Sequence, residues 1–120
     1  MLSRSVRTPS REGQLTPAPK APAVRIYGGA IVCANAAGVA VPGAADAALR
    51  FLGVAESEAI SGERTVHVRR NVDFLLRSAA GADAVTAAGL GRPCWIVDDE
   101  FVAGSDGGGT RPAAGIVTGL

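Results

Sequence analysis

The 120-residue sequence has few of the side chains from which most catalytic and metal sites are built. It holds one histidine, two cysteines and five aromatic residues, and no lysine follows Lys20. Cys33 and Cys94 belong to no CxxC or Cys/His pattern, and each lies in an apolar run, which favours a buried thiol and leaves a disulfide open. His67 lies beside Arg69 on the polar side of an alternating segment, where a solvated residue is more ordinary than a general base. We expect no catalytic residue, no metal and no cofactor.

The sequence also lacks long apolar runs. No stretch of about 18 consecutive apolar residues occurs, and the first fourteen residues have no apolar core of the signal-peptide type. These absences disfavour secretion and membrane spanning, so we expect the chain to fold in the cytoplasm.

Charge and proline are concentrated at the start of the chain. Residues 1–25 carry five cations against one acid, a net +4, whereas residues 26–120 carry seven arginines against ten acids, a net −3. Four of the seven prolines lie in residues 1–22, which hold almost no large apolar side chain. We therefore predict an extended arm over residues 1–23 that orders only on an acidic partner, either nucleic acid or a protein surface.

The remainder, residues 24–120, has the turn-rich texture of a β-protein. Sixteen glycines break the sequence into short apolar segments, and the core must be built from small aliphatic residues. A surface loop with one short helix, from near Thr86 to Gly91, interrupts the series. The spacing predicts an all-β domain, a small sandwich or barrel of about seven short strands. The predicted strands are residues 25–34, 39–41, 50–57, 65–76, 94–99, 101–103 and 113–120.

Two polar clusters near the end of the chain invite chemical interpretations. Asp98 and Asp99 are adjacent, so on a strand they face opposite sides, and a tight acidic turn before Phe101 is favoured over a cation site. The stretch GSDGGGT (104–110) is glycine-rich, but a phosphate-binding loop needs a lysine and a following helix. Arg111 and Pro112 follow instead, which indicates a wide loop.

Three stretches of the chain carry motifs in a fixed order. The first has an arginine- and proline-bearing lead, a Tyr-x-Gly strand and an Asn-x-x-Gly turn, in RTPSREGQLTPAPKAPAVRIYGGAIVCANAAGVAVPG (7–43). The second pairs an arginine-bearing strand with a Cys-aromatic-x-Val-Asp-Asp strand, in LGVAESE (52–58) with TVHVRRNVDFLLRSAAGADAVTAAGLGRPCWIVDDEFVA (65–103). The third is the Asp-Gly and Thr-Arg ending, in SDGGGTRPAAGIV (105–117). In this order, the three stretches resemble a family of small decoration or cement proteins from the heads of tailed bacteriophages.

The resemblance covers nearly the whole chain and implies a structural virion protein. Its partners would be the major capsid protein and further copies of itself, as a homotrimer on the capsid surface, after synthesis in the bacterial cytoplasm. We expect the arm to contact the capsid and a second set of residues to lie between subunits. The arm residues are Arg4, Arg7, Arg11, Pro17, Pro19, Lys20 and Pro22, and the interface candidates are Arg69, Arg70, Trp95, Asp98 and Asp99. The alternative is a small nucleic-acid-associated protein that uses the arm's cations, although aromatic residues for base stacking are scarce.

Overall fold

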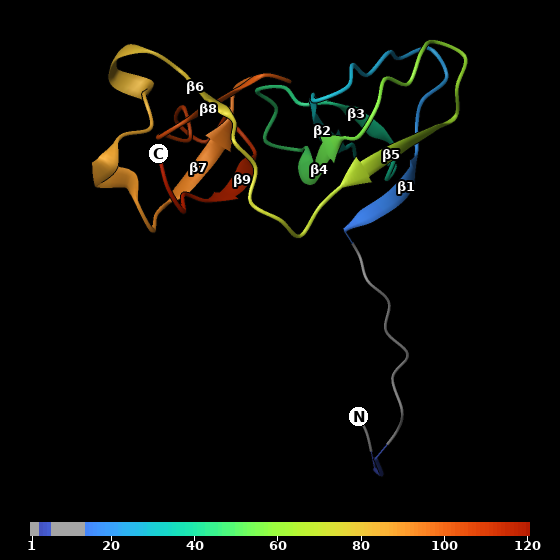
Figure 1. Ribbon diagram of the computed structural model, residues 1–120, viewed down its shortest axis with the longest axis horizontal. Helices are drawn as coiled ribbons and strands as arrows, with labels where there is room; N and C mark the ends of the chain where they lie inside the picture. Colours follow the sequence, from blue (N-terminus) through green and yellow to red (C-terminus); the bar gives the residue numbers. More distant parts are fainter. Residues whose placement is uncertain (1–2, 6–13) are drawn as a thin grey trace.

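The computed structural model describes residues 3–5 and 14–120, and the strands within residues 14–120 form two β-sheets side by side (Figure 1). The all-β fold expected from the sequence is confirmed. The five-stranded sheet has the order β1-β5-β4-β2-β3, and the four-stranded sheet has the order β6-β8-β7-β9. The strands are β1 (Leu15–Pro19), β2 (Ile31–Ala34), β3 (Ala40–Pro42), β4 (Arg50–Ala55), β5 (Thr65–Arg69), β6 (Arg77–Ser78), β7 (Pro93–Ile96), β8 (Phe101–Ala103) and β9 (Ala113–Ile116).

The five-stranded sheet is antiparallel and contains the expected hairpin of β2 and β3. Asn35 forms its turn, because its side-chain oxygen accepts hydrogen bonds from the backbone N–H groups of Ala37 and Val39. Gly38, with a φ of 77°, supplies the left-handed residue that this turn requires. The turn is thus encoded by the Asn-x-x-Gly spacing.

An isolated parallel bridge between Lys20 and Ala40 joins the two outer strands of this sheet. Lys20 directly follows β1, and Ala40 begins β3, so the bridge brings the sheet's two ends together into a small closed barrel. Lys20 is 3% exposed, and its ammonium group donates to the backbone carbonyls of Ala21, at 2.9 Å, and Val24. A buried ammonium is tolerated where its donors are satisfied in this way.

The strand β2 is buried on both faces and therefore belongs to two cores. Val32 faces the interior of the five-stranded sheet, with Ile26, Val66 and Val68. Its neighbours Ile31 and Cys33 face the other way, into a second core between the sheets. That second core also contains Cys94, Ile96 and Val102. A continuous apolar run is what a strand with two buried faces requires.

The first structural correction concerns the arm. β1 lies within residues 1–23 and pairs with β5 over its whole length, from Leu15 opposite Arg69 to Pro19 opposite Thr65. The strand can contain prolines because Gln14 and Lys20 make the backbone hydrogen bonds at the two ends of the β1–β5 pair. Pro17 and Pro19 lie at the alternate positions, so their nitrogens point away from β5. Residues 14–23 are thus part of the barrel, and we call residues 1–13 the leading segment.

The second correction concerns the segment expected to be one strand over residues 65–76. β5 ends at Arg69, and Asn71 has a φ of 61°, which breaks the extended conformation. The residues from Arg70 to Leu76 then cross from the five-stranded to the four-stranded sheet (Figure 1). The helix expected between Thr86 and Gly91 is present as the 3-10 turn η2 (Ala87–Gly89), and a similar turn, η1 (Gly81–Asp83), precedes it.

Candidate functional site

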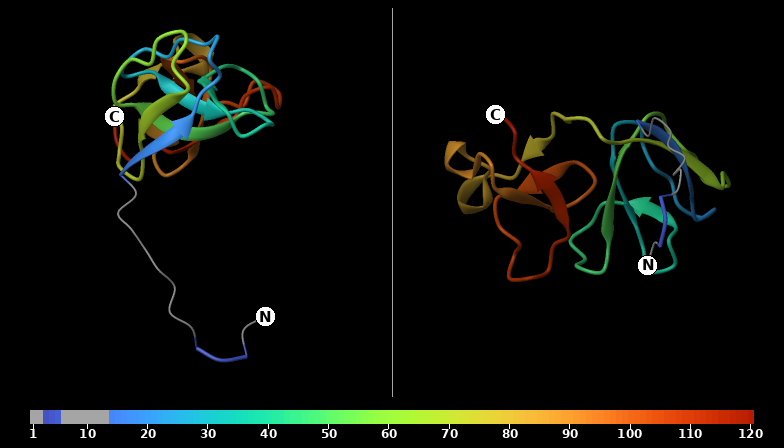
Figure 2. Two further views of the ribbon diagram at one scale, coloured as in Figure 1. Left: turned by 90° about the vertical axis from the view of Figure 1, so that its right-hand side faces the viewer. Right: turned by 90° about the horizontal axis from the view of Figure 1, so that it is seen from below.

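A groove of about 650 Å³ lies between the crossing segment 70–76 and the edge of the four-stranded sheet. One wall is the crossing segment, and the other is β9 with the residues that follow it, up to Leu120. Phe51, Cys94 and Val102 contribute to the lining between these walls. The groove therefore lies where the two sheets meet, as Figure 2 shows for the sheets themselves.

The rim of this groove exposes large apolar side chains. Leu75 is 98% exposed, Leu120 72% and Ile116 58%. Single exposed apolar residues are ordinary, but three beside one apolar hollow form a patch of the kind that marks a binding surface. The sequence carried a signal for it, because Leu75 and Leu76 break the alternation expected of a half-buried strand.

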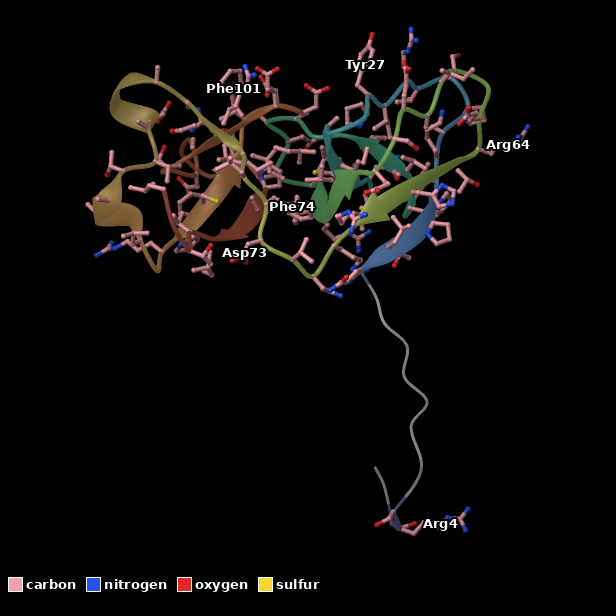
Figure 3. All side chains as sticks on the ribbon, in the orientation of Figure 1. Arg4, Tyr27, Arg64, Asp73, Phe74 and Phe101 are labelled. Atoms are coloured by element: carbon pink, nitrogen blue, oxygen red, sulfur yellow. The ribbon has the colours of Figure 1, made fainter. Side chains whose placement is uncertain are left out.

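Two charged residues line the same groove. Arg70 is the first residue of the crossing segment, and its backbone N–H donates to the carbonyl of Gln14 at 2.8 Å. Asp73, labelled with Phe74 in Figure 3, accepts a hydrogen bond at 3.3 Å from the Thr118 hydroxyl on the opposite wall. Among the described residues that line the groove, Asp73 has the one acidic side chain.

The wall formed by β9 is also an open sheet edge. β7 is the only strand that pairs with β9 in the part of the chain that the structure describes. A strand with one free edge presents backbone N–H and C=O groups on which another extended chain can pair. The groove thus combines an apolar lining with an unpaired backbone edge, which is what a site for an extended peptide requires.

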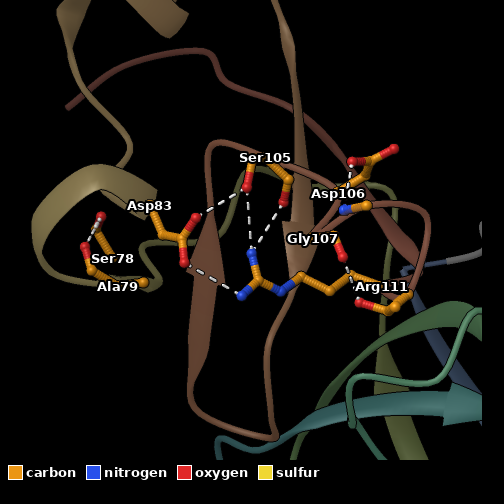
Figure 4. Close-up of polar contacts among 9 residues, drawn as sticks. Ser78, Ala79, Asp83, Ser105, Asp106, Gly107 and Arg111 are labelled. Atoms are coloured by element: carbon orange, nitrogen blue, oxygen red, sulfur yellow. Dashed lines mark hydrogen bonds and ion pairs between the residues drawn. The ribbon is translucent and has the colours of Figure 1, made fainter.

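The glycine-rich loop at residues 104–112 is held by internal contacts (Figure 4). The Arg111 guanidinium donates to Asp83 at 3.3 Å and to the Ser105 hydroxyl at 3.3 Å, and Ser105 donates to Asp83 at 2.9 Å. The pKa of Asp83 is lowered, most strongly by the hydrogen bond from Arg111 and next by the hydrogen bond from Ser105. The backbone N–H groups of Gly108, Thr110 and Arg111 all donate to Asp106, so the loop uses these donors itself.

The interface candidates from the sequence lie on separate elements. Arg69, at the end of β5, pairs with Glu56 at 2.7 Å, and Arg70 lines the groove. Trp95, on β7, is half-buried and lines a second hollow of about 330 Å³. Asp98 forms the expected acidic turn, because its carboxylate accepts from the N–H groups of Glu100, at 2.8 Å, and Phe101, at 2.7 Å. The carbonyl of Asp99 accepts from Ile31 at 2.8 Å.

The residues assigned to capsid contact divide into two groups. Pro17, Pro19, Lys20 and Pro22 belong to the barrel, and buried Lys20 is a barrel residue instead of a contact residue, which corrects the sequence interpretation. Arg4 is described and lies apart from both sheets (Figure 3). Arg7 and Arg11 fall outside the described residues.

The remaining reactive side chains are placed as follows. Cys33 and Cys94 are free thiols in the core between the sheets, and burial raises the pKa of Cys33 to about 11 and also raises that of Cys94. A thiol with a raised pKa is a poor nucleophile at neutral pH. His67 is exposed on β5, opposite Pro17.

Two general searches complete the description of the site. Within residues 3–5 and 14–120, no three His, Cys, Asp or Glu side chains are grouped so that they could hold a metal ion. No helix in the described ranges is long and apolar enough to cross a membrane.

Comparison with protein-family models, with curated proteins and with solved structures finds no match.

Proposed function

We propose that this chain is a capsid decoration protein of a tailed bacteriophage, which binds the outer surface of the shell and stabilises it. The structural observation that supports this most directly is the apolar groove beside the free edge of β9, since it offers adhesive surface through which the copies of a coat can join one another. The ordered resemblance of residues 7–117 to the decoration family supports the same proposal from the sequence.

A shell under internal pressure gains stability from added contact area between its subunits, and a binding protein supplies that area without chemistry. A protein contact of standard size buries on the order of 1,600 Å² in total. Many such contacts around a shell act together, so each can be weak. In this proposal the copies form trimers, and the cationic leading segment contributes to attachment to the major capsid protein.

The test is binding to expanded, decoration-free heads assembled from the major capsid protein encoded in the same genome. We expect the full chain to co-sediment with these heads, to raise the temperature at which they break, and to give added density in electron-microscopy images. Heads that retain neither the protein nor any gain in stability would contradict the proposal.

The contribution of the leading segment is tested with charge-matched variants of the full chain. Arg7→Ala with Arg11→Ala should weaken co-sedimentation severalfold, because it removes two cations from the leading segment. Arg64→Ala with Arg92→Ala is the control, since it removes the same charge from exposed positions on the body. Equal effects of the two pairs would show that only net charge matters.

Filter binding to duplex DNA separates the proposal from the nucleic-acid alternative. We expect the protein to show little affinity for duplex DNA at physiological salt. Tight binding whose logarithm falls steeply with the logarithm of salt concentration would favour the alternative.

A further inference from the structure

We propose that the groove between segment 70–76 and β9 binds the leading segment of a neighbouring copy of this chain, which adds to β9 as a further strand. The proposal goes beyond shell attachment, because it links the copies of a coat laterally. It depends on the groove and the sequence of residues 1–8 and does not require that the protein binds a phage shell.

The place where the leading segment joins the body supports this occupant. Gln14, the first residue of the described body, is hydrogen-bonded to Arg70, and Arg70 itself lines the groove. The leading segment therefore starts beside the groove rim of its own molecule, and Arg4 lies apart from both sheets of that molecule (Figure 3). In a ring of copies, such a segment can reach the adjacent rim.

The leading segment is long enough to contain both a connecting stretch and a strand. Residues 9–13 contain Pro9 and Gly13 and no large apolar side chain, and five extended residues span about 17 Å. Pro9 cannot donate to a ladder, so it marks the end of the part that pairs. Residues 2–8 remain, and as a strand they span about 23 Å.

The side-chain pattern of residues 2–8 matches the groove. Because side chains alternate along a strand, Leu2, Arg4 and Val6 share one face when the segment is extended. Two apolar side chains flanking one cation suit an apolar groove whose described lining holds the carboxylate of Asp73, with Arg70 at the start of the crossing segment. In this arrangement Leu2 and Val6 cover the groove, Arg4 faces Asp73, and Arg7 and Arg11 remain free for the shell.

Charge and symmetry favour exchange between copies. The leading segment carries three arginines against one acid, a net +2, whereas residues 14–120 carry nine cations against ten acids, a net −1. A segment-to-groove contact is heterologous, since two different surfaces meet, and such contacts close into rings when the rotation allows. A closed ring of three satisfies every groove.

Cross-linking of the full chain tests the occupant directly. Leu75 is replaced by the photo-cross-linker p-benzoylphenylalanine, which its 98% exposure permits without disturbing the core. Equal amounts of ¹⁵N-labelled and unlabelled protein are mixed, irradiated, digested and analysed by mass spectrometry. We expect products that join position 75 to residues 1–8 of a chain with the other label.

Every other outcome overturns the proposal. Products only within one label would show that each chain fills its own groove, and products only with a neighbour's body would make the groove a plain subunit contact. Yields no higher than those from the same cross-linker at Leu90, which is 49% exposed and outside the groove lining, would show an empty groove.

Self-association of full-length variants provides the second measurement. Val6→Ser and Leu75→Ser should each weaken association in sedimentation equilibrium about tenfold or more, because each removes a buried apolar contact. Leu90→Ser is the matched control and should leave association unchanged. Association unaffected by both test variants would refute the exchange, whereas failure to bind heads with intact exchange would refute only the decoration function.

Discussion

The two sheets contain similar small apolar side chains but differ in how these side chains are buried. The five-stranded sheet joins its outer strands through Lys20 and Ala40 and encloses its own core. The four-stranded sheet has short strands and a free edge at β9, and its buried residues pack on Ile31 and Cys33 of β2. We therefore expect the second sheet to depend on the first more strongly than the first depends on the second.

The difference shows how a chain with few aromatic residues can be both stable and adhesive. The large apolar side chains at the groove, Leu75, Ile116 and Leu120, are exposed around the second sheet, where none of the described residues covers them. The barrel carries the stability that offsets this exposure. We expect substitutions in the barrel to unfold the molecule and substitutions near the groove to change binding.

The largest expected effect comes from a pair of glycines with nearly the same backbone conformation. Gly53 on β4 has a φ of 153°, and Gly115 on β9 has a φ of 159°. A Cβ at Gly53 would lie 2.2 Å from the Arg69 carbonyl oxygen, whereas a Cβ at Gly115 meets nothing within 4 Å. Both alanine variants carry backbone strain, but Gly53→Ala must also separate β4 from β5.

We expect Gly53→Ala to lower the free energy of unfolding by about 3 kcal/mol more than Gly115→Ala, as measured by urea denaturation. Similar losses for the two variants would mean that the barrel is no more tightly packed than the second sheet.

The next effect distinguishes the two cores. Ile26 and Ile96 are both fully buried, the first inside the barrel and the second between the sheets. Each substitution by alanine should cost about 2–5 kcal/mol, but hydrogen exchange should differ. Ile26→Ala should speed exchange in both sheets, and Ile96→Ala mainly in β7, β8 and β9. Equal acceleration everywhere after Ile96→Ala would show that the sheets unfold as one unit.

The sequence predicted the parts of this fold that local chemistry determines. The Asn35–Gly38 turn, the Asp98 turn and the all-apolar β2 follow from residues close together in the chain. The barrel strand β1 was missed because prolines exclude a central strand, and only the pairing with β5, fifty residues away, reveals that their nitrogens face outward.

The groove was missed for a related reason. The side-chain alternation that begins at Thr65 predicted a strand as far as Leu76. Asn71 interrupts this strand with a positive φ, which the alternation does not indicate. Buried Lys20 was likewise assigned to capsid contact. The sequence pattern does not show that its ammonium group donates to the carbonyls of Ala21 and Val24. Both features depend on the local backbone conformation, which the alternation and the charges of the side chains do not reveal.

A smaller effect tests the closure of the barrel. Lys20→Met keeps a long apolar stem but removes the donors to the carbonyls of Ala21 and Val24. The Ala21 carbonyl keeps the hydrogen bond from the Val24 N–H at 3.2 Å, so the loss of the donor to the half-buried Val24 carbonyl should dominate and cost about 1–3 kcal/mol in thermal or urea unfolding. Arg64→Met is the control, since Arg64 is exposed and lies beside Lys20 in the barrel, where its carbonyl accepts from the Lys20 N–H at 2.9 Å. A Lys20→Met protein as stable as the control would show that the bridge to Ala40 holds without the ammonium group.

The smallest effect concerns the polar contacts of the second sheet. Hydrogen bonds from Arg111 and Ser105 lower the pKa of Asp83 in the folded protein, so this carboxylate stabilises the fold above its unfolded pKa and loses that contribution as the pH falls through the folded value. Because Asp83 is solvent-accessible, the gain is small and sensitive to salt. Asp83→Asn should therefore lower stability slightly at neutral pH and not at acid pH, whereas Glu63→Gln, at an exposed position in the barrel, should change neither. An Asp83→Asn loss that persists below pH of about 2 would assign the effect to packing of the 104–112 loop and not to charge.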